Sequence, residues 1–303
     1  MKKVFLLFLA VMVLPVFSYR AEAAGLVGPS ITKEFNLKDF NGINVSSFYE
    51  VTLIKDNRCK VTVECDKDLE KYLKVSVSNG VLHLGLDKIP QSLQRKDRHI
   101  LKATVHMPSL TYLKMSGATS LESEGRFEGR ERFSLDMSGA SKASGLSIYA
   151  DRADIEMSGA SKCKDFAGRF GKVGLSASGA AKLELDIDAD VWNVGMSGAV
   201  KADLKGGHTR SIRMESSGAV NTNLGISSDN LTYEGSGASK LNAQGAPASR
   251  VNVEISGSSK CRVDVLEYLE VEASGASECL YKAPKNATVK TNNPGRLTTV
   301  QAI

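Results

Sequence analysis

The lysines of this sequence include a series at a fixed interval. Six of them stand four residues after a recurring serine: Lys142, Lys162, Lys182, Lys201, Lys240 and Lys260, with Asn221 at the same place in one repeat. If the repeats stack, neighbouring ammonium groups lie about 4.8 Å apart and repel by about 0.9 kcal/mol per pair at the dielectric constant of water. An anionic glycan lying along the stack would offset this repulsion. The alternative is a solvated face whose charged side chains spread apart and resist aggregation.

An acidic series precedes the same serines by two residues. Its members are Asp136, Glu156, Glu215, Glu234, Glu254 and Glu272, and Ser176 and Gly195 interrupt it. Paired carboxylates can hydrolyse glycosidic bonds, but only where two of them lie about 5–10 Å apart in a cleft and titrate differently. A ladder of equivalent, exposed acids singles out no such pair. We therefore predict no catalytic residues, and a polysaccharide lyase or hydrolase is the alternative that this pattern favours least.

Two of the cysteines could form a disulfide or remain as buried thiols. The spacing of the histidines does not predict a metal site. Cys261 and Cys279 occupy the same place in neighbouring repeats, five residues after the serine. An oxidising compartment would allow a disulfide between them. Leu183 and Leu241 fill the same column, which favours a stacked pair of buried thiols instead. The four histidines are scattered without ligand spacing, so we predict no metal and no cofactor.

A glycine follows the recurring serine in each of nine repeats. These glycines are Gly117, Gly139, Gly159, Gly179, Gly198, Gly218, Gly237, Gly257 and Gly275. They are 18 to 22 residues apart, and such regular spacing is typical of stacked coils in which each unit packs only against its neighbours. A sharp corner requires either a positive φ or an approach too close for a Cβ atom. We therefore predict that the nine glycines are structural corners.

Short alternating segments flank each Ser-Gly pair. Ala153–Met157 before one corner and Lys182–Ile187 after another alternate apolar and polar residues, a period of two that marks half-buried strands. The repeats lack the i, i+3, i+4 spacing of an amphipathic helix. The predicted fold is therefore all-β: a single-stranded parallel β-helix, or solenoid, of about nine coils of about 20 residues each. We expect a right-handed winding, as in nearly all parallel crossovers.

The chain divides into four predicted segments. These are a signal peptide at 1–23, an N-terminal β-rich cap at 24–112, a β-helix repeat region at 113–283 and a C-terminal cap or tail at 284–303. Within the cap segment, Ile43–Leu53 matches the pattern of Leu113–Ser123, which indicates a degenerate first coil. Asn79-Gly80 indicates a hairpin turn. A cap is expected because an uncovered terminal coil exposes a strand edge.

The N-terminus and the charge balance predict an exported protein that does not bind nucleic acid. Lys2 and Lys3, an apolar run at 4–17 and the small-residue site Ala21-Glu22-Ala23 are typical of an export signal, and the run is too short to span a membrane. Its removal takes away three basic residues and one acidic residue, which lowers the formal net charge from +5 to +3. This near-neutral balance excludes the electrostatic footprint of a nucleic-acid-binding protein.

Four features together resemble one known family. They are the Asn41-Gly42-Ile43-Asn44 stretch, the Phe48-Tyr49-Glu50-Val51 strand, the hairpin at 75–84 and the Ser-Gly-Ala repeats. The combination, which covers about residues 31–283, resembles the head GIN-domain family of exported bacterial proteins, which carry the label of autotransporter adhesins. The resemblance implies a β-helix-like fold, an envelope location and no catalytic residues. We expect no translocator barrel after the repeats, and therefore no self-transport.

The residue patterns and the resemblance predict a non-catalytic exported protein of the cell envelope or cell surface. We expect an adhesin or glycan-binding β-solenoid whose partner is an anionic glycan or another envelope component. A purely structural envelope protein is the alternative. The sequence leaves open whether the protein stays in the periplasm, lies on the outer surface or is secreted, and whether it forms a homo-oligomer.

Overall fold

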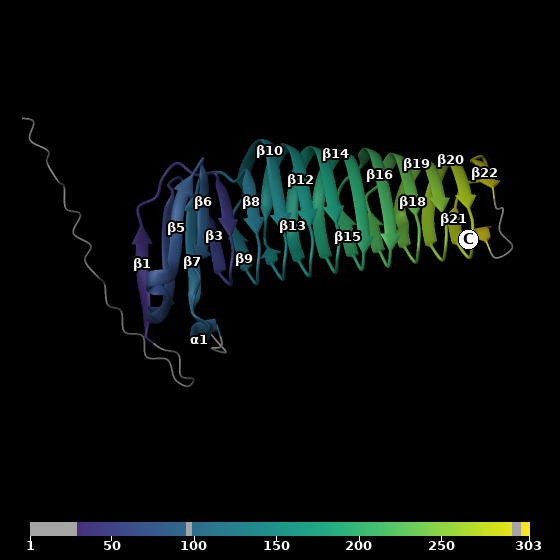
Figure 1. The fold of residues 1–303 in the computed structure, drawn as a ribbon. Helices are drawn as coiled ribbons and strands as arrows, with labels where there is room; N and C mark the ends of the chain where they lie inside the picture. Colours follow the sequence, from purple (N-terminus) through teal and green to yellow (C-terminus); the bar gives the residue numbers. More distant parts are fainter. Residues whose placement is uncertain (1–28, 95–98, 293–297) are drawn as a thin grey trace, which may run out of the picture.

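The protein forms an elongated rod of stacked coils with a cap at its N-terminal end (Figure 1). The computed structural model describes residues 29–94, 99–292 and 298–303. The predicted signal peptide at 1–23 lies outside the described residues. The colours of Figure 1 run in order along the rod, because each coil packs against the coils that precede and follow it in the sequence.

Each coil has one strand before its Ser-Gly corner and one strand after it. Before the corners lie β2 (Gly42–Val45), β8 (Tyr112–Met115), β10 (Phe127–Met137), β12 (Ser147–Met157), β16 (Thr209–Gly218), β18 (Ser228–Gly235) and β22 (Thr288–Asn292). After the corners lie β3 (Glu50–Lys55), β9 (Ser120–Glu124), β11 (Lys142–Ser144), β15 (Lys201–Lys205), β17 (Asn221–Gly225), β21 (Glu278–Lys282) and β23 (Thr299–Ala302). Four long strands pass through the opposite bend and belong to both sets: β13 (Lys162–Ala177), β14 (Lys182–Gly198), β19 (Lys240–Ile255) and β20 (Lys260–Ala273).

The strands of neighbouring coils pair in parallel and in register. Leu135 pairs with Ile155, and Ile155 pairs with Leu175, so equivalent residues form files along the rod. This arrangement confirms the predicted all-β solenoid of about nine turns. The inward files of the strands are mostly apolar, because the strands alternate between a buried and an exposed side. The large side chain of Trp192 is only 1% exposed and fills this core.

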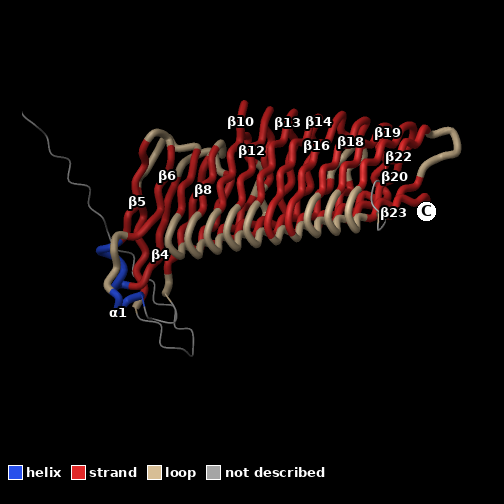
Figure 2. The backbone as a smooth tube through the Cα atoms, turned by 45° about the vertical axis from the view of Figure 1, so that its right-hand side comes forward, coloured by secondary structure: helices blue, strands red, loops and turns tan. Residues whose placement is uncertain are grey.

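The nine Ser-Gly corners form one edge of the rod, where Figure 2 shows a row of loops. All nine glycines have φ between +68° and +84°. A Cβ atom at any of them would lie 2.4–3.0 Å from a backbone atom of the preceding corner. At Gly159 that atom is the Gly139 carbonyl oxygen, at 2.6 Å, and the same oxygen accepts the Ala160 N–H at 2.8 Å. The corner therefore needs glycine both for its backbone angle and for the stacking distance.

The stack starts with a corner that has no glycine. Ile43 of β2 pairs with Leu113 of β8, so β2 and β3 form a first coil whose corner residue is Ser47. Ser47 has φ +75°, in the range of the nine glycines, and its carbonyl oxygen accepts the Ala118 N–H at 2.8 Å. The pattern shared by the two sequence segments thus corresponds to a shared backbone conformation.

Seven elements complete the cap. They are β1 (Ser30–Phe35), β4 (Lys60–Asp66), the 3-10 helix η1 (Lys67–Tyr72), β5 (Leu73–Ser78), β6 (Val81–Leu86), α1 (Gln91–Gln94) and β7 (Leu101–Met107). On one side of the first coil, β6 pairs in parallel with β2, and β5 is the antiparallel partner of β6. The turn between β5 and β6 has positive φ at Asn79 and Gly80, which confirms the predicted hairpin. On the other side, β7 pairs in parallel with β3, and β4 and β1 follow as antiparallel strands.

The C-terminal segment adds further stacked strands. Leu269 of β20 pairs with Val289 of β22, and Cys279 of β21 pairs with Val300 of β23, both in parallel. This segment therefore continues the two sets of strands beyond the last Ser-Gly corner.

A file of buried hydroxyl side chains runs inside the corners and was not predicted. It lies one residue after the alanine of each Ser-Gly-Ala and consists of Thr119, Ser141, Ser161, Ser239, Ser259 and Ser277, with Ala181, Val200 and Val220 in the middle coils. Two members are linked, because the Ser239 hydroxyl donates to Ser259 Oγ at 3.1 Å. These side chains are small enough to fit the tight inner side of the bend.

Candidate functional site

The six predicted lysines form one file on the outer surface of the strands after the corners, which we call the lysine face. In-register pairing runs from Lys142 through Lys162, Lys182 and Lys201 to Asn221, and then to Lys240 and Lys260. The structure thus places these side chains in a single line with one residue per coil.

Carboxylates offset the charge of this file unevenly. Lys182 Nζ lies 3.0 Å from Glu184 Oε1, and Lys260 Nζ lies 2.7 Å from Glu278 Oε2. Within the described part of the chain, Lys162 has no carboxylate oxygen within 4.0 Å. In that part of the chain Lys142, Lys201 and Lys240 also lack such a partner, so the uncompensated charge is spread along the file, with Lys142 and Lys162 adjacent at the end nearest to the cap.

A second row of side chains widens the positive surface at that end. Lys164 lies two residues beyond Lys162 on the same face and was not among the predicted residues, although the Lys-x-Lys spacing signals it. Partial desolvation, and then the charges of Lys164 and Lys182, lower the pKa of Lys162. The hydrogen bond from Lys182, aided by the charge of Lys164, lowers the pKa of Glu184. We call Lys142, Lys162, Lys164 and Lys182 the lysine patch; an anion beside it would relieve the repulsion among the ammonium groups.

Three lysines of the patch line a groove of about 610 Å³ where the cap meets the first coils, which we call the cap groove. Its floor crosses seven adjacent strands in the order β1, β4, β7, β3, β9, β11 and β13. Figure 1 shows β7, β3 and β9 side by side at this junction. The groove is lined by Lys102, Lys142, Lys162, Lys164, Glu50, Glu64, Glu122 and a set of threonine and serine side chains.

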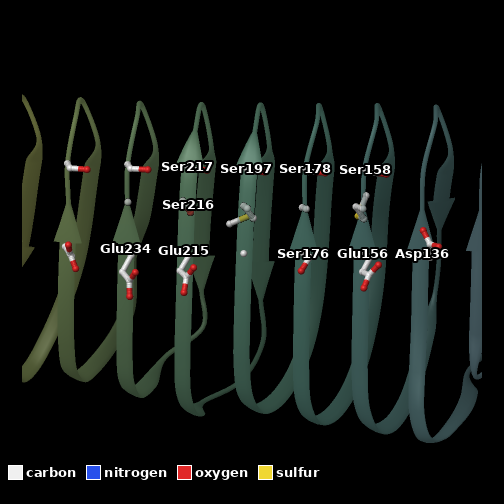
Figure 3. A pocket seen from close by; sticks show the side chains of 18 residues that line it. Asp136, Glu156, Ser158, Ser176, Ser178, Ser197, Glu215, Ser216, Ser217 and Glu234 are labelled. Atoms are coloured by element: carbon white, nitrogen blue, oxygen red, sulfur yellow. The ribbon is translucent and has the colours of Figure 1, made fainter.

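The acidic series lies on the other outer surface, on the strands before the corners, which we call the carboxylate face. Figure 3 shows a groove across these strands, lined by carboxylates such as Glu156 and Glu215 and by the corner serines. The groove has a volume of about 700 Å³. Ser176 and Gly195 leave the middle of the acidic row open, and a Cβ atom at Gly195 would meet no atom within 4 Å.

Cations on the carboxylate face already hold several of these acids. The Lys114 ammonium contacts Asp136, and an Arg213 nitrogen lies 3.1 Å from Glu215 and 2.7 Å from Glu234. The carboxylates stand in an open row along the groove, and no two of them are set apart in an enclosed cleft within the described ranges. This arrangement does not provide the acid and base pair that glycosidic hydrolysis requires.

Four of the five cysteines, all except Cys59, are buried. Burial raises the pKa of Cys163 to about 12, so almost no thiolate forms at neutral pH. Cys261 and Cys279 pair in register in neighbouring coils, and both are free thiols that share a hydrogen bond. That hydrogen bond, together with burial, raises the pKa of Cys261. The two cysteines are thus stacked neighbours in the core, and a disulfide between them in an oxidising compartment stays a prediction.

The buried histidine of the cap has a structural environment. His99 Nδ1 lies 3.0 Å from Asp66 Oδ2, and His99 Nε2 lies 2.5 Å from the Leu93 carbonyl oxygen. Nowhere in residues 29–94, 99–292 and 298–303 do three metal-ligating side chains gather. Neither helical segment of the described chain has the length and apolar character that a membrane crossing needs.

Comparison with known families identifies the fold. The family model described as "Putative auto-transporter adhesin, head GIN domain" matches residues 39–186 and 170–283. This chain belongs to the head GIN-domain family. The match confirms the resemblance found in the sequence.

Two solved structures from Parabacteroides species are similar to this chain. The head GIN-domain protein is 17% identical to an adhesin-like protein from Parabacteroides distasonis, whose structure is described as that of a putative adhesin, with a TM-score of 0.56 over 91% of this chain and 98% of that chain. A second such structure, from Parabacteroides merdae, is 16% identical, with a TM-score of 0.48 over 91% of this chain and 97% of that chain. At 17% identity, the likeness to the Parabacteroides distasonis protein shows a shared fold alone. A search of curated proteins found no match.

Proposed function

We propose that this head GIN-domain protein is an exported, adhesin-like protein of the cell surface that acts by binding and not by catalysis, and that its lysine file binds an anionic glycan. The family supports an exported surface protein with an adhesin-like role. The single observation that carries the glycan part is the file itself, in which exposed ammonium groups recur once per coil.

A linear polyanion matches such a file in geometry and in energy. Neighbouring strands are about 4.8 Å apart, so an extended chain that runs along the rod meets a lysine at each step. Charge-assisted hydrogen bonds are about twice as strong as neutral ones. The protein as a whole is nearly neutral after the predicted signal is removed, so the attraction is local to this face.

The distribution of reactive groups supports a non-catalytic role. The thiol of Cys163 is buried and protonated, and the carboxylates of the acidic row line an open groove, where lysine and arginine already pair with several of them. A nucleophile needs an adjacent base, and a glycosidase needs two carboxylates in different environments. Ser78 and Ser227 each lie beside a histidine, at 2.9 and 3.3 Å, but both pairs are exposed and line neither groove. The described part of the acidic row has no carboxylate pair set apart in an enclosed cleft.

Binding of acidic polysaccharides to the purified protein tests the glycan part. Replacement of Lys162, Lys182 and Lys201 by alanine should weaken the binding of a polyuronate at least about tenfold, because three charge-assisted contacts are lost. The matched control replaces Lys172, Arg210 and Arg250 on other surfaces by alanine, which changes the net charge equally. Equal losses in the two variants, or no binding of any acidic polysaccharide, would contradict the proposal.

Protease treatment of intact cells tests the surface location. A surface protein should disappear from intact cells while a periplasmic marker remains. If the protein is degraded only after the outer membrane is opened, a purely structural role inside the envelope becomes the better explanation.

A further inference from the structure

The cap groove has a polarity that distinguishes it from the rest of the lysine face. Lys142, Lys162 and Lys164 line one end, on β11 and β13, whereas Glu122, Glu50 and Glu64 lie on β9, β3 and β4 toward the cap, with Lys102 of β7 between the last two. We propose that the cap groove binds a short oligosaccharide whose acidic group lies at one end, over Lys142, Lys162 and Lys164, and whose neutral units extend across the cap. This inference rests on the proposed function and narrows it to one site and one ligand class.

Two rows of side chains cross the groove from strand to strand in register. One row runs through Glu64, Lys102, Glu50, Ser120, Lys142 and Lys162. The other row runs through Thr62, Thr104, Thr52, Glu122, Ser144 and Lys164. The seven strands of the floor span six spacings of about 4.8 Å, or about 29 Å. The floor is therefore long enough for several sugar units, and its chemistry changes from one end to the other.

The lysine end suits a single acidic group. Lys162 and Lys164 are both half-buried, so part of each side chain packs against the floor. Among the described residues, Lys142 and Lys162 have no carboxylate oxygen within 4.0 Å, and Lys164 has only Glu184, at 3.9 Å. A ligand carboxylate between these amines would relieve the repulsion that contributes to the lowered pKa of Lys162.

The middle of the floor suits the hydroxyl groups of a sugar. Thr62, Thr104 and Thr52 are neighbours on β4, β7 and β3, and each is half-buried. A threonine hydroxyl both donates and accepts, as sugar hydroxyls do. In the described structure none of these three hydroxyls has a protein hydrogen-bond partner, so all three are available to a ligand.

The glutamates make the groove selective against a uniform polyanion. Glu64 and Glu50 flank Lys102, and Glu122 adds a further negative charge beside Thr52. A chain with an acid on every unit would place carboxylates next to these glutamates and would be repelled. A chain with one terminal acid avoids that repulsion. The groove thus differs from the lysine file beyond it, which suits a long polyanion.

Calorimetric titration of the purified protein with four probes tests this inference. The probes are 3′-sialyllactose with one terminal acid, its neutral parent lactose, trigalacturonate with an acid on every unit, and inorganic tripolyphosphate with charge but no sugar hydroxyls. We expect 3′-sialyllactose to bind at least about tenfold more tightly than each of the others. If lactose binds as tightly as 3′-sialyllactose, the lysines do not contribute to binding, and the inference is wrong. If trigalacturonate or tripolyphosphate binds as tightly as 3′-sialyllactose or more tightly, the groove does not select a sugar chain with one terminal acid, and the inference is wrong.

Substitutions locate the binding in the groove. Lys162→Ala and Lys164→Ala should each weaken the binding of 3′-sialyllactose at least about tenfold. Thr104→Val, which keeps the shape of the side chain, should weaken it about fivefold. The matched controls should leave it unchanged: Lys240→Ala lies in the same file outside the groove, and Thr232→Val lies on the carboxylate face. Equal effects in the variants and their controls would overturn the assignment.

A gain of binding provides a second, independent test. The double variant Glu50→Gln and Glu122→Gln removes two negative charges from the cap end, so trigalacturonate should bind at least about fivefold more tightly than to the unmodified protein. An unchanged affinity for trigalacturonate would contradict the proposed exclusion.

The outcomes separate this inference from the proposed function. If a long polyuronate binds and the Lys162, Lys182 and Lys201 variant loses it, while 3′-sialyllactose does not bind, then the proposed function stands and the cap-groove assignment is wrong. If neither a polyuronate nor 3′-sialyllactose binds, both are wrong.

Discussion

The first corner of the rod and the nine that follow share a backbone conformation but differ in sequence. Ser47 has φ +75°, and Gly117 in the next coil has φ +77°. A Cβ atom at Gly117 would lie 2.4 Å from the Ser47 carbonyl oxygen. No Ser-Gly corner precedes Ser47 in the described stack, because its neighbours β6 and β7 are not joined by a corner. The comparison separates two requirements. A serine can adopt the positive φ at a cost in free energy, but no residue with a Cβ atom fits where the backbone of a preceding corner lies this close.

The largest expected loss of stability tests the close approach between the backbones of neighbouring corners. Gly198→Ala combines φ +84° with a Cβ 2.7 Å from the Gly179 carbonyl oxygen, so it should destabilise the protein by at least about 3 kcal/mol. Gly245→Ala has φ +80° but no atom within 4 Å and should cost only about 1 kcal/mol. Gly195→Ala has open space and no positive φ and should stay within about 0.5 kcal/mol. Urea denaturation measures all three, and equal costs at Gly198 and Gly245 would show that stacking distance does not matter.

A buried contact between a histidine and an aspartate tests how the cap differs from the repeats. The cap uses His99 and Asp66, whose side chains are only 8% and 6% exposed. His99→Gln leaves the carboxylate buried without its partner and should cost about 3 kcal/mol in the free energy of unfolding. Replacing both residues by leucine should cost clearly less, because no charge is then left buried. A double-mutant cycle with zero coupling energy would show that this pair does not hold the cap together.

Ser47→Gly should stabilise the protein. The serine holds a left-handed conformation that costs an L-residue about 1 kcal/mol, and glycine adopts it without that cost. The melting temperature of the Ser47→Gly variant should therefore be higher than that of the unmodified protein. The control is Ser46→Gly, whose backbone is not in the left-handed region and whose hydroxyl donates to the Leu84 carbonyl oxygen at 3.4 Å, so it should lower stability slightly. A loss of stability in Ser47→Gly would mean that the serine side chain has a role of its own.

The smallest expected effect concerns an exposed ion pair of the repeats. Partial desolvation acts to raise the pKa of Asp154, but the guanidinium groups of Arg152 and Arg132 outweigh it and lower the pKa. A lowered carboxylate pKa contributes stability above the ordinary value of about 3.9, and that contribution is lost as the pH falls through the folded-state pKa. Asp154→Asn should therefore cost about 0.5 kcal/mol at pH 7 and progressively less below pH 4. Thermal unfolding of both proteins across this pH range checks the trend. If the difference in stability between them does not become smaller at acidic pH, the ion pair is not its cause.

The repeats were predictable from the sequence because parallel, in-register stacking converts equal sequence positions into equal places. The spacing of residues such as Gly159 and Lys162 was enough to place the corners along one edge and the lysines in one file. The cap was only partly predictable. The Asn79-Gly80 turn has a local signal, but β1 pairs with β4, and β4 with β7, across long and non-repeating separations that depend on tertiary packing.

Two features of the candidate sites had weak signals or none. Lys164 occupies a position that holds Ser144 and Glu184 in the neighbouring coils, so no periodic search would select it; its importance comes from the groove that the cap creates. The buried hydroxyl file was missed because a serine such as Ser161, after Ser-Gly-Ala, is typical of an exposed turn. Its burial follows from the tight bend, which only the stacked backbone reveals.

The hydrogen bonds at the corners have a mechanical consequence. The N–H of Ala199 donates to the Gly179 carbonyl oxygen at 2.8 Å, and equivalent bonds link each corner to the one before it. These bonds lie roughly parallel to the long dimension of the molecule, as do those between the strands. A tensile load on a terminal strand therefore pulls each bond along its own direction and breaks one coil before the next. Tension should lengthen the protein in steps of one coil, whereas a sideways load would have to displace many coils together.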